Sequence, residues 1–115
     1  MDDRTPHHPD VRTIPLQQVL EALVDPVRRS IVRQLREADA DIACGSFDIA
    51  VSKSTATHHF RILREAGLIR QHYVGTSRMN TLRDAEFAEA FPGLLDAVVD
   101  AERNAPAAAR RPARA

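Results

Sequence analysis

The sequence predicts a mainly α-helical domain that carries one β-hairpin, and three observations lead to this prediction. Apolar residues recur at helical spacing in several separate stretches of the chain. One stretch, residues 69–82, instead places β-tolerant residues on both sides of Gly75-Thr76, a pair suited to a tight turn. The chain has 115 residues, 43% of them apolar and 28% charged, which is enough for one domain with a modest core.

The first two expected helices adjoin each other. Residues 16–23 form the first, and its apolar residues at i, i+3, i+4 and i+7 spacing are Leu16, Val19, Leu20 and Leu23. Asp25-Pro26 starts the second, because Asp caps helix N-termini and Pro suits the first helical position. Its apolar residues repeat every four positions at Val27, Ile31 and Leu35. Residues 38–45 are expected to form a linker.

Two more helices are expected before the hairpin. Ser46 is a candidate cap for a short helix over residues 46–50. Ser52 begins the longest helix, residues 52–66, and Gly67 is its expected C-cap. The buried stripe of that helix consists of Ala56, Phe60 and Leu63.

The last expected helical region covers residues 84–103, with a break or kink at Pro92-Gly93. Its wide apolar face consists of Phe87, Phe91, Leu94, Leu95, Val98 and Val99. Residues 1–15 contain three prolines and are expected to form a flexible arm. The Ala/Pro/Arg-rich residues 104–115 are expected to form a disordered tail, which leaves residues 16–103 as the folded domain.

The resulting order is four helices, a hairpin and a final helix. A short helix, a tight turn and a longer helix with polar residues at its start form a helix-turn-helix, and the hairpin that follows forms a wing. The sequence therefore predicts a winged helix-turn-helix with terminal helices that can serve in dimerisation.

The formal net charge is zero, but the charges are distributed unevenly. Residues 52–83 contain six cations and one acid, whereas residues 84–102 contain six acids and no Lys or Arg. A basic stretch confined to one part of a domain is typical of a polyanion binder, although solvated charges also cluster by chance.

Several other classes of protein are disfavoured. The chain contains no Gly-rich phosphate loop, nucleophile elbow or His-Glu-x-x-His run, so we expect no enzymatic activity. Aromatic residues make up only 4%, which argues against stacking platforms for single-stranded nucleic acid. There is no long apolar run, so we expect no membrane association. The single cysteine, Cys44, excludes an internal disulfide and leads us to expect a cytoplasmic protein.

Two segments of the chain resemble the ArsR/SmtB family of bacterial transcriptional regulators. The stretch from Leu23 to Arg29, LVDPVRR, resembles that family's L-x-D-P-x-R helix start. The stretch from Ser52 to Ile69, SKSTATHHFRILREAGLI, resembles its recognition helix, S-x-S-T-x-S-x-H-L-x-x-L-R-x-A-G-L. The resemblance extends over roughly residues 16–102.

This resemblance implies a homodimer that binds a double-stranded DNA operator, usually as a repressor. Its two recognition helices would enter successive major grooves. A winged-helix module that binds a protein co-regulator, or an activator on the same fold, remains an alternative. The basic recognition helix favours DNA, because a protein-binding module has little use for it.

Candidate DNA-binding residues follow from the donors that base edges and phosphates require. In the recognition helix they are Lys53, Ser54, Thr55, Thr57, His58 and Arg61. In the wing they are Thr76 at the tip and Arg78, with Arg70 and His72 as weaker candidates. His59 lies next to the apolar stripe, so we expect it to pack rather than to contact bases.

Candidate dimerisation residues come from the apolar faces of the first and last helices. They are Leu16, Val19, Leu20, Leu23, Phe91, Leu94, Leu95 and Val98. Exposed apolar helices would be an aggregation liability in a monomer, so burial against a second copy is expected.

The metal-sensing positions of the family are degenerate in this chain. Where the family carries Cys-x-Cys, this chain has Asp41-Ile42-Ala43-Cys44. Where the family carries Asp-x-His and His-x-x-Glu, it has Asp84-Ala85-Glu86 and Ala97-Val98-Val99-Asp100. One thiol and three carboxylates are poor ligands for nickel or zinc, so we assign no metal site, although such an ion stays possible. His7-His8 could bind a metal, and Cys44 could act as a redox switch or simply as a half-buried cysteine.

Overall fold

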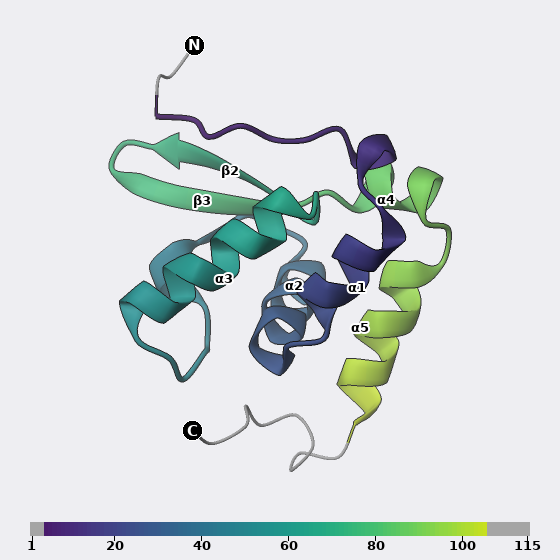
Figure 1. The fold of residues 1–115 in the computed structure, drawn as a ribbon. Helices are drawn as coiled ribbons and strands as arrows, with labels where there is room; N and C mark the ends of the chain where they lie inside the picture. The colour runs from purple at the N-terminus through teal and green to yellow at the C-terminus, as the bar shows by residue number, and fades with distance from the viewer. Residues whose placement is uncertain (1–3, 106–115) are drawn as a thin grey trace.

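The computed structural model describes residues 4–105, and its elements have the arrangement of a winged helix-turn-helix (Figure 1). In chain order they are η1 (Val11–Thr13), α1 (Leu16–Leu23), α2 (Pro26–Ala38), β1 (Ile42–Ala43), η2 (Cys44–Ser46), α3 (Lys53–Glu65), β2 (Ile69–Val74), β3 (Ser77–Leu82), α4 (Asp84–Ala90) and α5 (Leu94–Asn104). The β2–β3 hairpin projects to one side above α3, while α5 packs on the opposite side of α1 and α2. The mainly helical fold with a hairpin wing is confirmed.

The five α-helices of residues 4–105 all contribute to one core. Its most deeply buried apolar side chains, each no more than 1% exposed, include Val19, Ile31, Leu63, Leu68, Ile69, Phe87 and Val99. None of the helices among residues 4–105 combines the length and the apolar character needed to cross a membrane.

The junction between α1 and α2 is closed by polar side chains. The Asp25 carboxylate accepts hydrogen bonds from the backbone N–H groups of Val27 and Arg28, and Pro26 occupies the first helical position. Arg28 and Arg29 donate to the carbonyl oxygens of residues 21–24, which end α1. Helix ends leave such groups without intrahelical partners, so the two arginines satisfy the end of α1 and Asp25 satisfies the start of α2.

The prediction of a short helix over residues 46–50 is wrong. A single 3-10 turn, η2, ends at Ser46, and Phe47 has extended backbone angles (φ −77°, ψ 143°). The Gln34 side chain binds both backbone groups of Asp48, accepting from its N–H at 2.9 Å and donating to its carbonyl at 3.0 Å. These contacts replace the few hydrogen bonds that so short a helix could make, and short helices nucleate poorly.

The hairpin is part of a three-stranded antiparallel sheet with strand order β1-β3-β2. Strand β1 lies in the segment expected to be a linker. In the β2–β3 register, Gln71 faces Asn80 and Tyr73 faces Arg78. Directly paired residues share one face and alternate residues return to it, so these four side chains lie on the same side of the hairpin.

Residues 4–15, the described part of the arm expected to be flexible, pack against the rest of the domain. The Val11 and Ile14 side chains are only 1% and 7% exposed and belong to the core. They pack over Gly67, where the absence of a side chain leaves room for Ile14. The arm's few apolar residues are thus placed to add to the core of a small domain.

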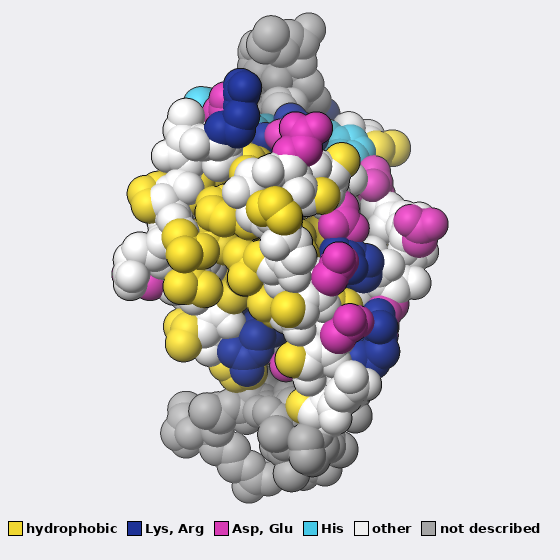
Figure 2. All heavy atoms as spheres, turned by 90° about the vertical axis from the view of Figure 1, so that its right-hand side faces the viewer, with side chains coloured by type: hydrophobic (Ala, Val, Ile, Leu, Met, Phe, Trp, Pro, Cys, Tyr) yellow, Lys and Arg dark blue, Asp and Glu magenta, His cyan; other side chains and the backbone are white. Residues whose placement is uncertain are grey.

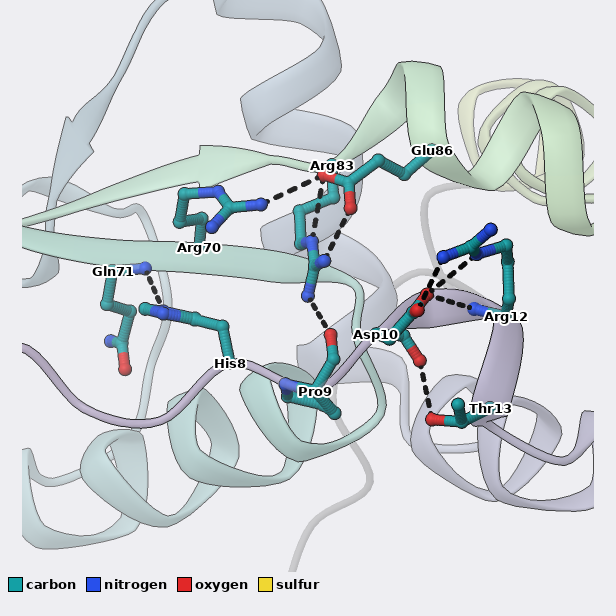
Figure 3. Close-up of polar contacts among 9 residues, drawn as sticks. All are labelled: His8, Pro9, Asp10, Arg12, Thr13, Arg70, Gln71, Arg83 and Glu86. Carbon is teal, nitrogen blue, oxygen red and sulfur yellow. Dashed lines mark hydrogen bonds and ion pairs between the residues drawn. The ribbon is translucent and has the colours of Figure 1, made fainter.

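Polar contacts hold the same segment along the edge strand β2 (Figure 3). His8 Nε2 accepts from the backbone N–H of Gln71 at 2.9 Å, and Arg83 donates to the Pro9 carbonyl at 2.7 Å. Arg4 donates to the carbonyl oxygen of Gly75 at the hairpin turn. The arm therefore covers an edge that would otherwise offer unpaired backbone groups.

The C-terminal helical region is broken at Pro92-Gly93, as the sequence predicts. Gly93 has φ +78° and separates α4 from α5. Most of the expected tail, from residue 106 onwards, lies outside the described residues.

Candidate nucleic-acid interface

Helix α3 presents a polar outer side and an apolar inner side. Ser52 caps it by accepting a hydrogen bond from the backbone N–H of Thr55 at 3.2 Å. The candidate DNA-binding side chains on this helix are all exposed, namely Lys53, Ser54, Thr55, Thr57, His58 and Arg61. Phe60 and Leu63 are buried on the opposite side. The structure thus leaves these six side chains accessible.

Contacts within the helix orient several of these side chains. Thr57 Oγ1 donates to the Lys53 carbonyl at 3.0 Å, and Arg61 Nη2 lies 3.0 Å from His58 Nδ1. The Ser52 hydroxyl donates to Thr55 Oγ1 at 2.9 Å. The outer surface of α3 therefore carries hydroxyl, imidazole and guanidinium groups of the kind that bind base edges and phosphates.

His59 packs in the interior, as the sequence predicts. It is 7% exposed, and its Nδ1 lies 3.1 Å from Arg28 Nη1. Burial lowers the pKa of His59, with Arg28 acting in the same direction. The neutral ring accepts the hydrogen bond from Arg28 and links α3 to the start of α2.

The two faces of the wing differ in how their cations are paired. On one face, Arg70 pairs with Glu86 at 3.0 Å and His72 lies 3.4 Å from Asp41. On the other face Arg78 makes no ion pair within residues 4–105, and its guanidinium lies 5.7 Å from the centre of the Tyr73 ring. Thr76 is exposed in the turn. Arg70 and His72, the weaker candidates, are therefore engaged with carboxylates.

Within the described part of the chain, four cations that make no ion pair lie on α3 and on the α3 side of the wing. We call them the unpaired cationic face: Lys53, Arg61, Arg64 and Arg78. Seven arginines elsewhere have carboxylate partners, namely Arg12, Arg29, Arg33, Arg36, Arg70, Arg83 and Arg103. Arg28 has none among residues 4–105, but it is buried and donates to the backbone carbonyls that end α1. This distribution leaves positive charge uncompensated where the outer side of α3 adjoins the wing.

Arg64 was not among the predicted site residues. Its position three residues after Arg61 places both on neighbouring parts of the helix surface, and this spacing could have indicated it. Its guanidinium donates to Gln71 Oε1 at 2.8 Å, a contact between α3 and β2 that sequence spacing does not reveal.

The predicted dimerisation residues fall into two groups. Leu16 and Leu20 on α1 are 51% and 45% exposed. Phe91, just before α5, and Leu94 and Val98 on α5 are half-buried. Figure 2 shows hydrophobic side chains gathered on this side of the molecule, and we call Leu16, Leu20, Phe91, Leu94 and Val98 the apolar face.

The remaining three predicted dimerisation residues belong to the core of the monomer. Val19, Leu23 and Leu95 are 0%, 5% and 3% exposed. They point inward because α1 and α5 each pack one side against the rest of the domain, so they cannot contact a second copy directly.

The carboxylates at the family's metal positions are engaged with arginines. Asp84 and Asp96 both bind Arg36, at 2.7 and 2.8 Å. Glu86 bonds to Arg83 and Arg70, which lower its pKa, and Asp100 bonds to Arg103 at 3.2 Å. No cluster of three or more potential ligands occurs among residues 4–105. The residues at these positions do not fit nickel or zinc.

Cys44 is half-buried beside two buried carboxamides. Its Sγ accepts from Asn80 Nδ2 at 3.2 Å and lies 3.8 Å from Gln71 Nε2. These contacts place the thiol in a packed polar network between the sheet and η2.

Comparison with known proteins agrees with this geometry. Residues 25–71 match the model of the family described as bacterial regulatory protein, arsR family. Over 81 residues the chain is 33% identical to an uncharacterized HTH-type transcriptional regulator of Bacillus subtilis (strain 168), YceK, with 69% of this chain and 81% of that protein covered. The recognition helix α3 and the first three residues of β2 lie inside the region matched by the family model. This chain belongs to the ArsR family of bacterial helix-turn-helix transcriptional regulators.

Proposed function

We propose that this regulator is a homodimeric repressor that binds a double-stranded DNA operator through α3 and the wing. The observation that carries the proposal is the unpaired cationic face. Its four cations lie beside the exposed donors of α3, and no carboxylate within residues 4–105 pairs with any of them.

DNA phosphates are the ligand that this arrangement suits best. Arginines held near one another without carboxylates repel, and a polyanion relieves that repulsion while it releases its own counterions. The exposed hydroxyls and Arg61 provide groups that can bind base edges when α3 lies in the major groove. Binding of a protein co-regulator would not in the same way explain why these four cations lack carboxylate partners.

The apolar face supports the homodimer. Leu16 and Leu20 are large apolar side chains exposed on the same helix, next to half-buried residues of α5. A second copy of the same face would bury them, and it would provide two recognition helices for the half-sites of one operator. The acidic residues of α5 such as Asp96 and Asp100 would also disfavour docking of that side on DNA.

A salt-dependent titration tests DNA binding. The wild-type protein should bind random duplex DNA with an affinity that falls steeply with salt, and it should bind a selected operator more tightly. Arg78→Ala should weaken binding to random duplex and to the operator. It should also reduce the slope of log affinity against log salt concentration by about one unit for each phosphate that Arg78 contacts. Arg12→Ala, which removes an exposed arginine paired with Asp10, is the matched control and should leave the slope unchanged. If the wild type fails to bind duplex DNA, the proposal fails and the protein-binding alternative gains support.

Repression is tested in cells. A reporter behind the selected operator should be expressed more strongly when the regulator is deleted, and complementation should restore low expression. A fall in expression upon deletion would make the protein an activator.

A further inference from the structure

Arg64 is held in place by a chain of hydrogen bonds that crosses the sheet. Its Nη1 donates to Gln71 Oε1 at 2.8 Å, and Gln71 Nε2 donates to Asn80 Oδ1 at 2.9 Å. Asn80 Nδ2 in turn donates to the carbonyl of Ile42 at 3.0 Å. Arg64 is therefore connected through two carboxamides to the backbone of β1.

The two carboxamides are almost completely buried. Gln71 is 1% exposed and Asn80 is 0% exposed, and they face each other in the β2–β3 register. Burial of a carboxamide costs free energy unless its hydrogen bonds are made, and a pair of apolar residues would fill a hairpin without that cost. The pair fixes the direction of Gln71 Oε1, which is the atom that receives Arg64.

Arg78 lies close to Arg64 on the same side of the hairpin. Burial lowers the pKa of Arg64, and the charge of Arg78 lowers it further. The Nε atoms of both arginines are buried and have no hydrogen-bond partner in the described structure. Both guanidinium groups thus lie on the α3 side of the hairpin, near enough for their charges to repel, and no carboxylate of residues 4–105 pairs with either.

We propose that Arg64 and Arg78 together bind one backbone phosphate of the operator, and that Gln71 and Asn80 position Arg64 for this contact. The proposal rests on the DNA binding proposed above and specifies one contact within it. Guanidinium groups match the geometry of phosphate oxygens, and two of them can share one phosphate.

The position of the pair favours a phosphate over a base. Arg64 is half-buried near the end of α3, whereas Lys53 and Ser54 are exposed at its beginning. In helix-turn-helix proteins the N-terminal part of the recognition helix contacts base edges. A cation fixed between the end of that helix and the wing is placed for the phosphate backbone that flanks the groove.

A scan with single methylphosphonate substitutions in the selected operator tests the contact. Each substitution removes the charge of one phosphate. For the wild type, one position per half-site should lower affinity by about tenfold, the effect of one charge-assisted contact. For Arg64→Gln the sensitivity at that position should fall, because only Arg78 still contacts the phosphate, while the other sensitive positions keep their effect.

Two variants separate this contact from a general effect of charge. Arg64→Lys keeps the charge but loses the planar fork, so it should keep most of the salt slope and lose part of the sensitivity at that phosphate. Arg70→Gln removes an arginine from the other face of the same hairpin, where it pairs with Glu86, and it should leave the scan unchanged. Equal effects of Arg64→Gln and Arg70→Gln at every phosphate would overturn the proposal.

The positioning role is tested with Gln71→Met, which removes the acceptor of Arg64 and keeps every cation. Its salt slope on random DNA should stay near that of the wild type, while sensitivity at the assigned phosphate should fall. In the Arg64→Gln background, Gln71→Met should cause no further loss of affinity for the operator, because its effect acts through Arg64. Urea unfolding verifies that Gln71→Met and the double variant are folded under the conditions of the titration. Additive losses in the double variant would show that Gln71 does not act through Arg64.

The outcomes also separate this inference from the proposed function. Failure of the wild type to bind DNA would refute both. Binding with an unchanged phosphate profile in Arg64→Gln would refute only the shared phosphate contact.

Discussion

Single polar side chains connect neighbouring elements in this domain. Asp25 and Arg28 close the turn between α1 and α2, and Gln34 fixes the backbone of Asp48. Gln71 connects β2 to α3 through Arg64. Each of these side chains satisfies groups that would otherwise be unpaired in or near the core, which is a requirement of burial rather than of any one secondary structure.

His8 makes the docking of the arm dependent on pH. Burial, together with Arg70, Arg83 and Arg64, lowers the pKa of His8 from 6.5 to about 4. Only the neutral ring can accept the hydrogen bond from the Gln71 N–H. Since the unfolded chain binds the proton more readily, this contribution to stability is complete above pH 6.5 and is lost as the pH falls towards 4.

We therefore predict that His8→Gln flattens the pH dependence of the free energy of unfolding. Glutamine keeps an acceptor and does not titrate, so the variant should lose less stability than the wild type between pH 7 and 4.5. Urea unfolding at a series of pH values measures this, with His7→Gln as a control that should follow the wild type. If the free energy of unfolding of the wild type and of His8→Gln changed with pH in parallel, His8 would not be held neutral. Some dependence should remain in all variants because the pKa of His59 is also lowered.

At the scale of elements, glycine positions determine how α3 ends and how the arm docks on it. Gly67 has φ +76°, and a Cβ there would lie 2.3 Å from Ile14 Cδ1. Gly93 has φ +78° but open space around it, and Gly45 has neither constraint. These three residues separate the effect of backbone conformation from that of packing.

Alanine substitutions at the three glycines should destabilise the domain to different extents. Gly45→Ala should change the free energy of unfolding little. Gly93→Ala should cost about 1 kcal/mol because L-residues disfavour positive φ. Gly67→Ala should cost about 1 kcal/mol more than that, because Ile14 must move within the packed core. Chemical denaturation measures the series, and equal costs for Gly67→Ala and Gly93→Ala would argue against tight packing of the arm.

At the scale of the whole molecule, cations and apolar side chains occupy separate surfaces. The unpaired cationic face lies on α3 and the wing, while the apolar face lies on α1, on α5 and on Phe91, which follows α4. Such a separation would let one surface bind a second copy while the other binds DNA, as proposed above.

Leu20→Asp tests the homodimer. Leu20 is 45% exposed, so a carboxylate there should leave the monomer folded but would be buried at the interface between copies. Sedimentation at micromolar concentration should show a dimer for the wild type and a monomer for the variant. Val74→Asp is the matched control, because Val74 is an exposed apolar residue at the wing, and it should remain dimeric. A monomeric wild type would contradict the prediction.

We also predict that zinc and nickel change operator affinity little. Asp84, Glu86 and Asp100 are hydrogen-bonded to arginines, and a metal ion would have to displace these partners. An ion alters DNA binding only if it binds the free and the DNA-bound forms with different affinity. Calorimetry with each ion, combined with operator titrations, decides the matter. Sub-micromolar binding with a tenfold change in operator affinity, about 1.4 kcal/mol, would contradict the prediction.

Local patterns in the sequence determined the helices, the hairpin and the break at Pro92-Gly93. Apolar spacing, N-caps such as Asp25 and Ser52, and glycine at turns act over a few residues, so they can be recognised without the fold. The basic composition of residues 52–83 likewise indicated the surface that carries the candidate site.

Only the tertiary structure decided what each surface packs against. An apolar pattern shows that Val19 and Leu95 are buried but does not say whether a second copy or the same chain covers them. The docking of Val11 and Ile14, and the contact between Arg64 and Gln71, join residues far apart or on different elements. Residues 47–51 form no helix because Gln34 binds the backbone groups of Asp48 in place of helical partners. These outcomes depend on which partners the folded chain brings together, and local spacing carries no information about that.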